Sequence, residues 1–295
     1  MGLELPELQV IDLDGPVRYR GWDGPGDTTF VLIHGLGGSH LNWVQVAPGL
    51  SGLGRVLALD LPGFGSTPRA GRGSGLMDER RVLNRFIEEL STGRAVLCGH
   101  SMGGVIAILE AAVEPASVAG LVLTSSAFPR VRGGWPHPAV VGAFAAYDSG
   151  VLGERFARMR IRMDAERAVR LGYRMVAADP QSIPEEIVRM SVDVIRERQR
   201  DPDAADAFLD AARSLLRLGK RPRIAAQALD AIPCPVLVLH GRRDRFVPVA
   251  FAEAALEHHP SWRGRIFPDL GHAPQMEAPG RWLSEVADWY AEQIE

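Results

Sequence analysis

One serine of this sequence stands where a nucleophile is expected. Ser101 is the central residue of the segment GHSMG at 99–103, which is the only G-x-S-x-G pattern in the chain. An apolar strand candidate, 95–98, comes before it, and an apolar helical run, 105–113, follows it. A strand, an abrupt turn and a helix form a nucleophile elbow, which holds a serine hydroxyl beyond the edge of a sheet. We therefore predict that Ser101 is a catalytic nucleophile.

A base and an acid for this serine follow later in the chain. A serine hydroxyl is a poor nucleophile until a histidine, oriented by a carboxylate, removes its proton. Asp244 follows the apolar strand candidate 236–240, and His272 follows the candidate 265–267. Both lie in loops just after strand ends, where ligand-binding residues collect in open parallel sheets. The order serine, aspartate, histidine is typical of elbow-type hydrolases, so we predict Asp244 as the acid and His272 as the base.

A glycine-rich loop supplies the fourth component of such a site. The apolar strand candidate 30–33 leads directly into His34 and the segment GLGG at 35–38. Glycines allow backbone N–H groups to point at a reacting carbonyl without interference from side chains. Our hypothesis is that the backbone N–H groups of Leu36 and Met102 form the oxyanion hole.

Other residues compete for the roles of acid and base. Asp269 is the alternative acid, because it lies three residues before His272 on the same loop; we interpret it as a turn residue. His34 and His100 belong to the two loop motifs, and we interpret them as residues that orient the backbone or line the site. Structural or surface positions are expected for the remaining histidines, which are His137, His240, His258 and His259.

With these motifs, the chain resembles the α/β-hydrolase superfamily, in particular its capped serine esterases and lipases. The matching stretches are HGLGG at 34–38, DLPGFGS at 60–66, and the segments 99–104, 241–248 and 271–272. The resemblance implies a mostly parallel eight-stranded sheet with helices on both faces and a lid inserted after the sixth strand. It also implies Ser101 as the nucleophile, His272 as the base and Asp244 as the acid that orients the base.

Departures from other branches of the superfamily narrow the reaction. Relatives that form an alkyl-enzyme, the haloalkane dehalogenases and epoxide hydrolases, carry aspartate at the elbow, where this chain has Ser101. Carbon–carbon bond hydrolases usually have asparagine just before the nucleophile, where this chain has His100. Some relatives carry the acid after the sixth strand. The corresponding segment here, 124–129, contains no carboxylate, which favours Asp244.

The order of the elements predicts an α/β protein with an insertion. Two short strands, 9–13 and 17–22, are expected to form an antiparallel edge hairpin around an Asp-Gly-Pro turn. Further strand candidates alternate with helices, which is typical of a mainly parallel sheet. They are 30–33, 56–59, 95–98, 118–124, 236–240 and 265–267. We expect a core formed by 1–127 and 230–295, interrupted by a helical cap over 128–229.

The predicted cap lacks strand character and contains four or five helical segments. Those segments are 139–146, 151–163, 165–177, 185–198 and 204–218. A cap over an active site excludes water and shapes the substrate pocket. Candidate residues for an apolar substrate site are Phe128, Trp135, Phe144, Tyr147 and Phe156, with Val247 from the loop that carries Asp244. The alternative is that these cap aromatics simply pack helices together.

Composition argues against several classes of ligand. A formal net charge of −3 and the lack of a dense basic run do not favour nucleic acid. The glycine-rich loops lack the features of phosphate or dinucleotide motifs, so no cofactor is expected. No histidine and carboxylate cluster has the spacing of metal ligands, so no metal is expected to be needed. Cys98 and Cys234 lie at apolar strand candidates and are predicted to be buried free thiols.

The sequence carries no pattern of a secreted or membrane protein. Two glutamates and a proline lie among the first seven residues, where a signal peptide has a basic start and an apolar core. No apolar run approaches the roughly 18 residues that span a bilayer. We expect a cytoplasmic protein; its oligomeric state is not predicted.

The sequence thus predicts hydrolysis of a small-molecule carboxylic ester, carrying an apolar group, through an acyl-enzyme. The alternatives within the same fold are a carbon–carbon bond hydrolase and a thioesterase. A third alternative, from another class, is a small-molecule receptor that keeps the three catalytic residues but turns over slowly.

Overall fold

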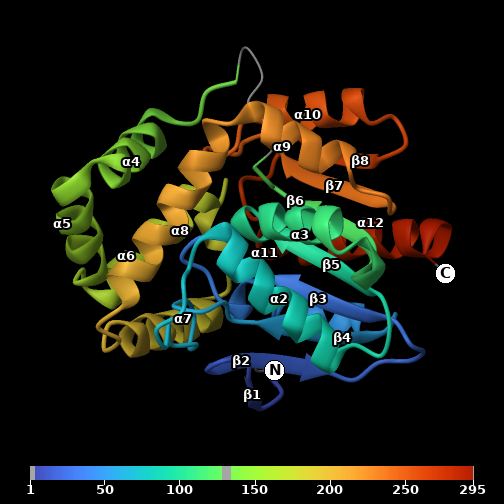
Figure 1. Ribbon diagram of the computed structural model, residues 1–295, viewed down its shortest axis with the longest axis horizontal. Helices are drawn as coiled ribbons and strands as arrows, with labels where there is room; N and C mark the ends of the chain where they lie inside the picture. The colour runs from blue at the N-terminus through green and yellow to red at the C-terminus, as the bar shows by residue number, and fades with distance from the viewer. Residues whose placement is uncertain (1–3, 128–133, 295) are drawn as a thin grey trace.

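The structure of this chain is a computed structural model that describes residues 4–127 and 134–294. Its strands form a single eight-stranded sheet in the order β1-β2-β4-β3-β5-β6-β7-β8 (Figure 1). The strands are β1 (Leu8–Asp12), β2 (Pro16–Trp22), β3 (Thr29–Ile33), β4 (Arg55–Leu59), β5 (Ala95–His100), β6 (Val118–Thr124), β7 (Val236–Gly241) and β8 (Arg263–Phe267). The predicted α/β fold with a mostly parallel eight-stranded sheet is confirmed.

Strand pairing follows the apolar patterns. β1 and β2 pair antiparallel, with Ile11 opposite Val17, as the Asp-Gly-Pro turn predicts. β2 pairs antiparallel with β4, and the remaining pairs are parallel. Every residue of β3, β5 and β7 is buried, because these central strands are covered by helices on both faces. Because these strands run parallel, their carboxyl ends lie at the same edge of the sheet.

Two hydrophobic cores lie on the two faces of the sheet. Successive strand residues point to opposite faces, so Val31 and Leu97 pack in one core, and Leu32 and Cys98 pack in the other. The first core includes side chains of α2, α3 and α10, and the second includes side chains of α1 and α12. These helices are α1 (Ala47–Leu50), α2 (Leu76–Leu90), α3 (Met102–Val113), α10 (Val249–His258) and α12 (Pro279–Gln293). Short α11 (Pro274–Glu277) precedes α12.

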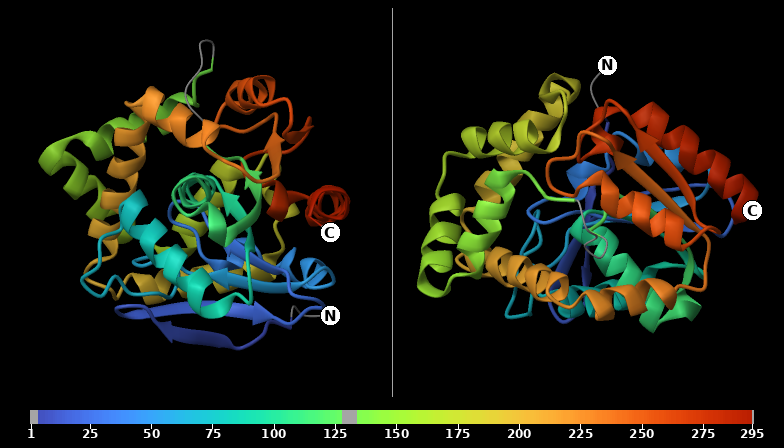
Figure 2. Two further views of the ribbon diagram at one scale, coloured as in Figure 1. Left: turned by 45° about the vertical axis from the view of Figure 1, so that its right-hand side comes forward. Right: turned by 90° about the horizontal axis from the view of Figure 1, so that it is seen from above.

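A long insertion separates β6 from β7, and its described residues form helices. They are α4 (Pro138–Asp148), α5 (Gly150–Ile161), α6 (Ala165–Val176), α7 (Glu185–Arg198), α8 (Ala204–Gly219) and α9 (Pro222–Asp230). Short 3₁₀ turns are η1 (His40–Asn42), η2 (Pro115–Ser117) and η3 (Pro180–Ser182). Figure 2 shows α4 and α5 at one side of the molecule, away from the sheet, whereas α8 contacts α2 and contributes Phe208 and Leu209 to the first core. The five predicted helical segments are found here, with no end shifted by more than two residues and both ends of α7 as predicted.

The last helix of the insertion, α9, was not predicted as a separate helix. A break at Lys220 and Arg221 ends α8, and Pro222 begins α9, because proline is well tolerated in the first turn of a helix. Residues of α9 and α3 line a common small apolar space, and Leu229 belongs to the core on that face of the sheet. The chain has thus returned to the sheet before β7 begins.

Two further sequence-based expectations concern cysteines and membrane spans. Cys98 and Cys234 are both buried and free, as predicted. In residues 4–127 and 134–294, no helix has the length and apolar character needed to cross a membrane.

Candidate active site

Ser101 lies in a strained turn between β5 and α3. Its backbone has φ 52° and ψ −114°, a left-handed conformation that side-chain-bearing residues rarely adopt. The backbone N–H of Ser101 donates to the carbonyl oxygen of Thr124 at 3.0 Å, which fixes the turn against the end of β6. Strain of this kind persists mainly at functional sites, where the surrounding structure holds it in place.

Glycines around Ser101 allow the close packing that this turn needs. A Cβ atom on Gly99 would lie 2.4 Å from the Cα of Gly104, and one on Gly103 would lie 2.2 Å from the carbonyl oxygen of Ile33. Side chains at either position would push α3 away from the sheet. A Cβ on Gly35 would lie 3.1 Å from the Cβ of Ser101, so the glycine-rich loop after β3 lies directly beside the serine.

Asp244 lies in the loop after β7, with its carboxylate fully buried. The Oδ1 atom accepts hydrogen bonds from the backbone N–H groups of Phe246 at 2.7 Å and Val247 at 2.9 Å. The Oδ2 atom lies 2.7 Å from Nδ1 of His272 and 3.3 Å from Nε2 of His240. Burial by itself raises the pKa of Asp244, but the two histidines outweigh it and hold the pKa well below its ordinary value. The carboxylate is therefore ionised.

The His272 ring is held on several sides. It stacks on Phe246 at a centroid distance of 4.9 Å, and the His100 ring lies 4.9 Å away on another side. Nε2 of His100 is 2.8 Å from the carbonyl oxygen of His272, to which it donates. Because Nδ1 of His272 faces Asp244, Nε2 is the ring nitrogen left for a reacting group. The predicted acid and base are thus in direct contact, and His100 connects the elbow of Ser101 to the base.

The alternative acid, Asp269, is engaged elsewhere. Its two carboxylate oxygens accept from the Arg281 guanidinium at 2.7 and 3.0 Å. This exposed pair joins the loop before His272 to α12, and it holds the pKa of Asp269 below its usual value. The geometry therefore favours Asp244 as the partner of His272.

Glu277 is a site residue that sequence reasoning missed. Its carboxylate accepts hydrogen bonds from the backbone N–H groups of Gly271 at 3.0 Å, Ala273 at 3.2 Å and Ala178 at 2.7 Å. Two of these donors flank His272, and the third follows α6 of the insertion. Burial raises the pKa of Glu277, while the N–H donors act in the opposite direction. Its position five residues after His272 was a signal, although only folding brings Ala178 to it.

The loop that carries Leu36 is fixed by a buried histidine. Nδ1 of His34 donates to the carbonyl oxygen of Gly35 at 2.8 Å, and Nε2 accepts from the backbone N–H of Leu61 at 3.1 Å. Burial lowers the pKa of His34 to about 4, so the ring is neutral and can both donate and accept. Leu36 is partly buried against the first core, and Met102 is buried at the start of α3. The expected role of His34 in orienting backbone is consistent with these contacts.

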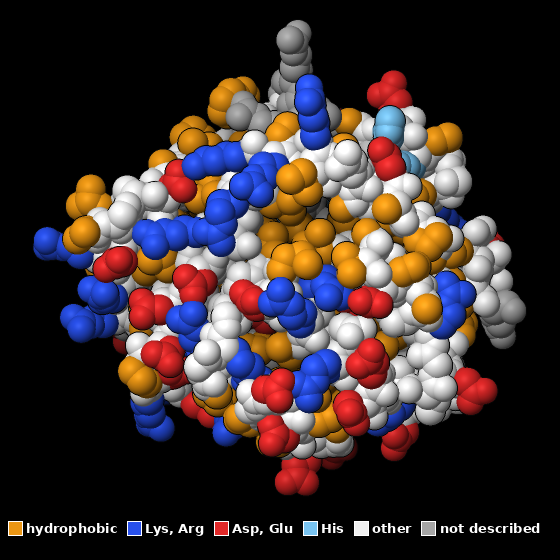
Figure 3. Space-filling model, viewed as in Figure 1, with side chains coloured by type: hydrophobic (Ala, Val, Ile, Leu, Met, Phe, Trp, Pro, Cys, Tyr) orange, Lys and Arg blue, Asp and Glu red, His pale blue; other side chains and the backbone are white. Residues whose placement is uncertain are grey.

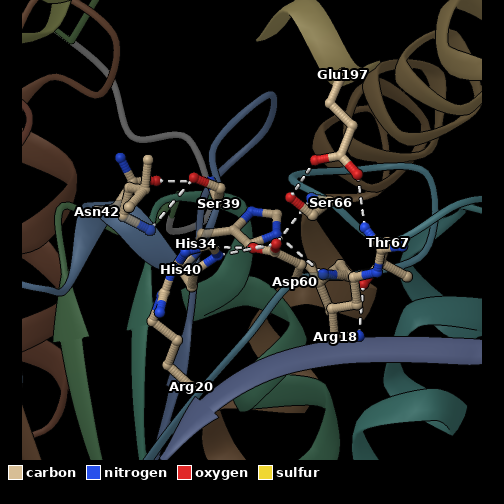
Figure 4. Close-up of polar contacts among 12 residues, drawn as sticks. Arg18, Arg20, His34, Ser39, His40, Asn42, Asp60, Ser66, Thr67 and Glu197 are labelled. Carbon is tan, nitrogen blue, oxygen red and sulfur yellow. Dashed lines mark hydrogen bonds and ion pairs between the residues drawn. The ribbon is translucent and has the colours of Figure 1, made fainter. Parts of the chain in front are cut away.

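A second buried aspartate, Asp60, contacts His40 just after the same loop (Figure 4). Asp60 accepts from the backbone N–H of His40 at 2.6 Å, from Nδ1 of His40 at 2.9 Å and from the backbone N–H of Ser66 at 2.8 Å. Burial raises the pKa of Asp60, but His40, His34 and the N–H of Ser66 together outweigh it, so the pKa is lowered. Ser66 also donates through its hydroxyl to Glu197 of α7 at 2.9 Å, which links the insertion to the core.

The predicted substrate-binding residues have different surroundings. Phe128 lies outside the described residues. The Trp135 side chain is at the surface, 68% exposed. Tyr147 is buried with its ring 6.0 Å from that of Phe144 and 5.1 Å from those of Phe156 and Phe208, which favours the packing interpretation for these residues. Val247 is buried, and its backbone N–H supports Asp244. On the face seen in Figure 3, apolar side chains gather near the middle, bordered by Lys and Arg side chains.

Comparisons with known proteins agree with the fold. A family model described as the alpha/beta hydrolase fold matches residues 28–279. The crystal structure of wild-type Cfl2 from Burkholderia cenocepacia is similar, with a TM-score of 0.80 at 25% identity, and the match covers 96% of this chain and 95% of that one.

Curated relatives carry names of three different kinds. The chain is 32% identical, over 91% of its length, to the dihydrolipoyllysine-residue acetyltransferase component of the acetoin cleaving system of Cupriavidus necator, and it spans only 65% of that relative. It is 28% identical to a 2-hydroxy-6-oxononadienedioate/2-hydroxy-6-oxononatrienedioate hydrolase of Cupriavidus pinatubonensis, covering 94% of this chain and 92% of the relative. It is also 28% identical to a pimeloyl-[acyl-carrier protein] methyl ester esterase of Klebsiella pneumoniae subsp. pneumoniae, covering 87% and 91%.

Proposed function

Because this chain belongs to the alpha/beta hydrolase fold family, we propose that it is a serine hydrolase that cleaves carboxylic esters through an acyl-enzyme intermediate. The observation that carries the proposal is the 2.7 Å contact between Nδ1 of His272 and the buried, ionised Asp244. This contact lies next to the strained turn of Ser101, to which His100 connects it. Cleavage of a methyl ester by one relative supports ester chemistry on this fold.

The roles follow from which ring nitrogen of His272 faces Asp244. Asp244 holds the Nδ1 proton of His272, so Nε2 is free to take the proton of Ser101 as its oxygen attacks the ester carbonyl. Asp244 then stabilises the imidazolium, and His272 protonates the leaving alcohol. In the second half-reaction His272 activates water, which releases the acid and restores Ser101.

Charge that develops on the carbonyl oxygen needs donors fixed in advance. We assign this role to the backbone N–H groups of Leu36 and Met102, from the loop after β3 and the first turn of α3. The closeness of Gly35 to Ser101 supports the assignment of Leu36, the next residue of that loop, and Met102 directly follows the nucleophile in the chain. The partial positive charge at the N-terminus of α3 favours the same oxyanion.

The alternatives differ in their substrates. One relative is named for hydrolysis of a dienedioate, which keeps carbon–carbon bond cleavage as the second candidate reaction. His100 argues against this reaction, because asparagine is usual at that position in the carbon–carbon bond hydrolases. Nε2 of His100 donates instead to the backbone carbonyl oxygen of His272. Thioester hydrolysis and slow-turnover binding remain the other candidates.

The test is a substrate panel with and without the nucleophile. Purified protein is assayed on aryl esters of increasing acyl length, on acyl thioesters and on vinylogous 1,5-diketones. We expect the highest kcat/KM on an ester, a mass increase on Ser101 after treatment with a fluorophosphonate, and a loss in Ser101→Ala on the order of 10⁴–10⁶-fold in kcat. Faster turnover of the diketone or thioester would replace the ester proposal. Tight binding without turnover would favour a receptor.

A further inference from the structure

We propose that Asp230, His258 and His259 form a binding site for a transition-metal dication, with Zn²⁺ as the best match. Their ligand atoms all lie within 4.8 Å of one another. Oδ1 of Asp230 is 3.3 Å from Nε2 of His258 and 3.6 Å from Nε2 of His259. In Figure 3 a histidine and an acidic side chain meet at the outer surface over α9 and α10.

The topology separates this cluster from the candidate active site. Ser101, Asp244 and His272 all follow the carboxyl ends of strands. Asp230 instead ends α9, shortly before β7 begins, and His258 and His259 end α10, shortly before β8 begins. The cluster therefore lies toward the amino-terminal edge of the parallel sheet, opposite the edge that carries the proposed chemistry. A metal here would serve structure and leaves the catalytic expectation, which needs no metal, unchanged.

The donor set and its spacing fit zinc. Zinc is bound tetrahedrally by imidazole nitrogen and carboxylate oxygen at about 2.0–2.2 Å, which places neighbouring ligand atoms about 3.3–3.5 Å apart. The two distances from Asp230, 3.3 and 3.6 Å, are close to that separation before any ion is added. Two imidazoles with one carboxylate disfavour Mg²⁺ and Ca²⁺, which prefer oxygen ligands, and suit Zn²⁺, Ni²⁺ and Cu²⁺.

His259 is held ready for a ligand. Its ring stacks on Trp262 at 4.1 Å with an interplanar angle of 10°, while the His258 ring stands edge-on to it at 4.8 Å. The Nε2 atom of His259 is buried, and among the described residues it has no hydrogen-bond partner.

The other two ligands give the site its access. His258 and Asp230 have side chains that are 71% and 53% exposed, so an ion can enter from solvent and keep water as its fourth ligand. No spacing in the sequence predicts this cluster, because an adjacent histidine pair lacks the usual spacing of metal ligands and Asp230 lies far before it in the chain. Folding α9 and α10 onto the same side of the sheet completes it. A bound ion would tie these two helices together.

The experiment uses the full chain without a histidine tag, freed of metals by chelation and dialysis. Calorimetric titration with Zn²⁺ should show one site per chain, and Mg²⁺ should show none. Asp230→Asn and His258→Ala, both at exposed positions, should keep the native circular dichroism and weaken Zn²⁺ binding by at least about tenfold. His137→Ala, which removes an exposed histidine elsewhere, is the matched control and should bind Zn²⁺ like the native chain.

Two further readouts locate the ion. Zn²⁺ at a hundredfold excess over its Kd should raise the Tm by about 4 °C in the native chain and much less in the variants. Cu²⁺ should quench the fluorescence of Trp262, and Trp262→Phe should lose that part of the quenching. Zn²⁺ binding that is absent, or that survives the double variant Asp230→Asn, His258→Ala unchanged, would overturn the proposal. Neither outcome bears on ester hydrolysis, so the two proposals are tested separately.

Discussion

At the scale of single residues, two aspartates near His272 distinguish the proposed acid from its competitor. Asp244 is buried and contacts the ring nitrogen of His272, whereas Asp269 is exposed and pairs with Arg281. We expect Asp244→Asn to lower kcat on an aryl ester by on the order of 10³–10⁴-fold, because the neutral amide neither fixes the ring nor stabilises the imidazolium. Asp269→Asn, the matched control, should stay within about twofold. Equal losses in both variants would contradict the assignment of Asp244.

A second residue, His100, makes a prediction about pH. Burial, and the nearby His272, lower its pKa to about 3 from the ordinary value of 6.5, so the folded chain keeps this ring neutral. As the pH falls below 6.5, His100 is protonated in the unfolded chain but not in the folded chain. The free energy of unfolding therefore falls until the pH reaches the pKa of His100 in the folded chain.

Comparison with His100→Asn isolates this effect from other titrating groups. Between pH 7 and pH 5 the free energy of unfolding of the native chain should fall by about 2 kcal/mol more than that of the variant. Urea unfolding, followed by circular dichroism at several pH values, measures the difference. Parallel curves for the two proteins would show that His100 is protonated in the fold.

At the scale of elements, Glu277 of α11 shows how a short helix fixes the loop that carries His272. Its carboxylate accepts N–H groups on both sides of His272 and one at the end of α6. Glu277→Gln replaces one acceptor oxygen with a donor, which would face those N–H groups. We expect kcat to fall by on the order of 10–100-fold, because a base displaced by a fraction of an ångström reacts poorly, while KM changes little.

The control for that variant is Glu292→Gln on α12, whose exposed carboxylate pairs with Arg263. It should leave both kcat and KM unchanged. If Glu277→Gln raised KM and left kcat intact, Glu277 would contact substrate and would not be a positioning residue.

How far the sequence predicts these elements depends on whether the signal is local. Local patterns predict elements and site residues well. Examples are the apolar run 30–33 with its glycine-rich loop, and the placement of Asp244 and His272 after strands. α9 was missed because its short helical pattern follows directly on that of α8. The contacts of Glu277 and the exposure of Trp135 depend on how the insertion folds against the core, which no local pattern records.

At the scale of the whole molecule, the insertion and the loop of His272 are in contact at one glycine. A Cβ on Gly271 would lie 2.5 Å from the carbonyl oxygen of Val176 and 2.6 Å from the backbone nitrogen of Ala178. The backbone N–H of His272 also donates to Val176 at 2.6 Å. Gly271→Ala should therefore push the two parts apart, lowering stability by about 1–3 kcal/mol and kcat by on the order of 10–100-fold.

Gly172 provides the matched control on α6, since a Cβ there meets nothing within 4 Å. Gly172→Ala should raise the free energy of unfolding by up to about 1 kcal/mol, because alanine favours helix, and leave kcat unchanged. Thermal unfolding and ester turnover of both variants check the pair. A fully active Gly271→Ala would mean that the insertion does not position the base.

The order of the strands also has a consequence for the newborn chain. β6 lies between β5 and β7 in the sheet, but the entire helical insertion separates β6 from β7 along the chain. During translation, at about 5–20 residues per second, the flank of β6 that awaits β7 stays uncovered for on the order of 10 s. Unpaired strand edges can pair with other chains, so ribosome-bound fragments ending just after β6 should aggregate unless a chaperone binds them.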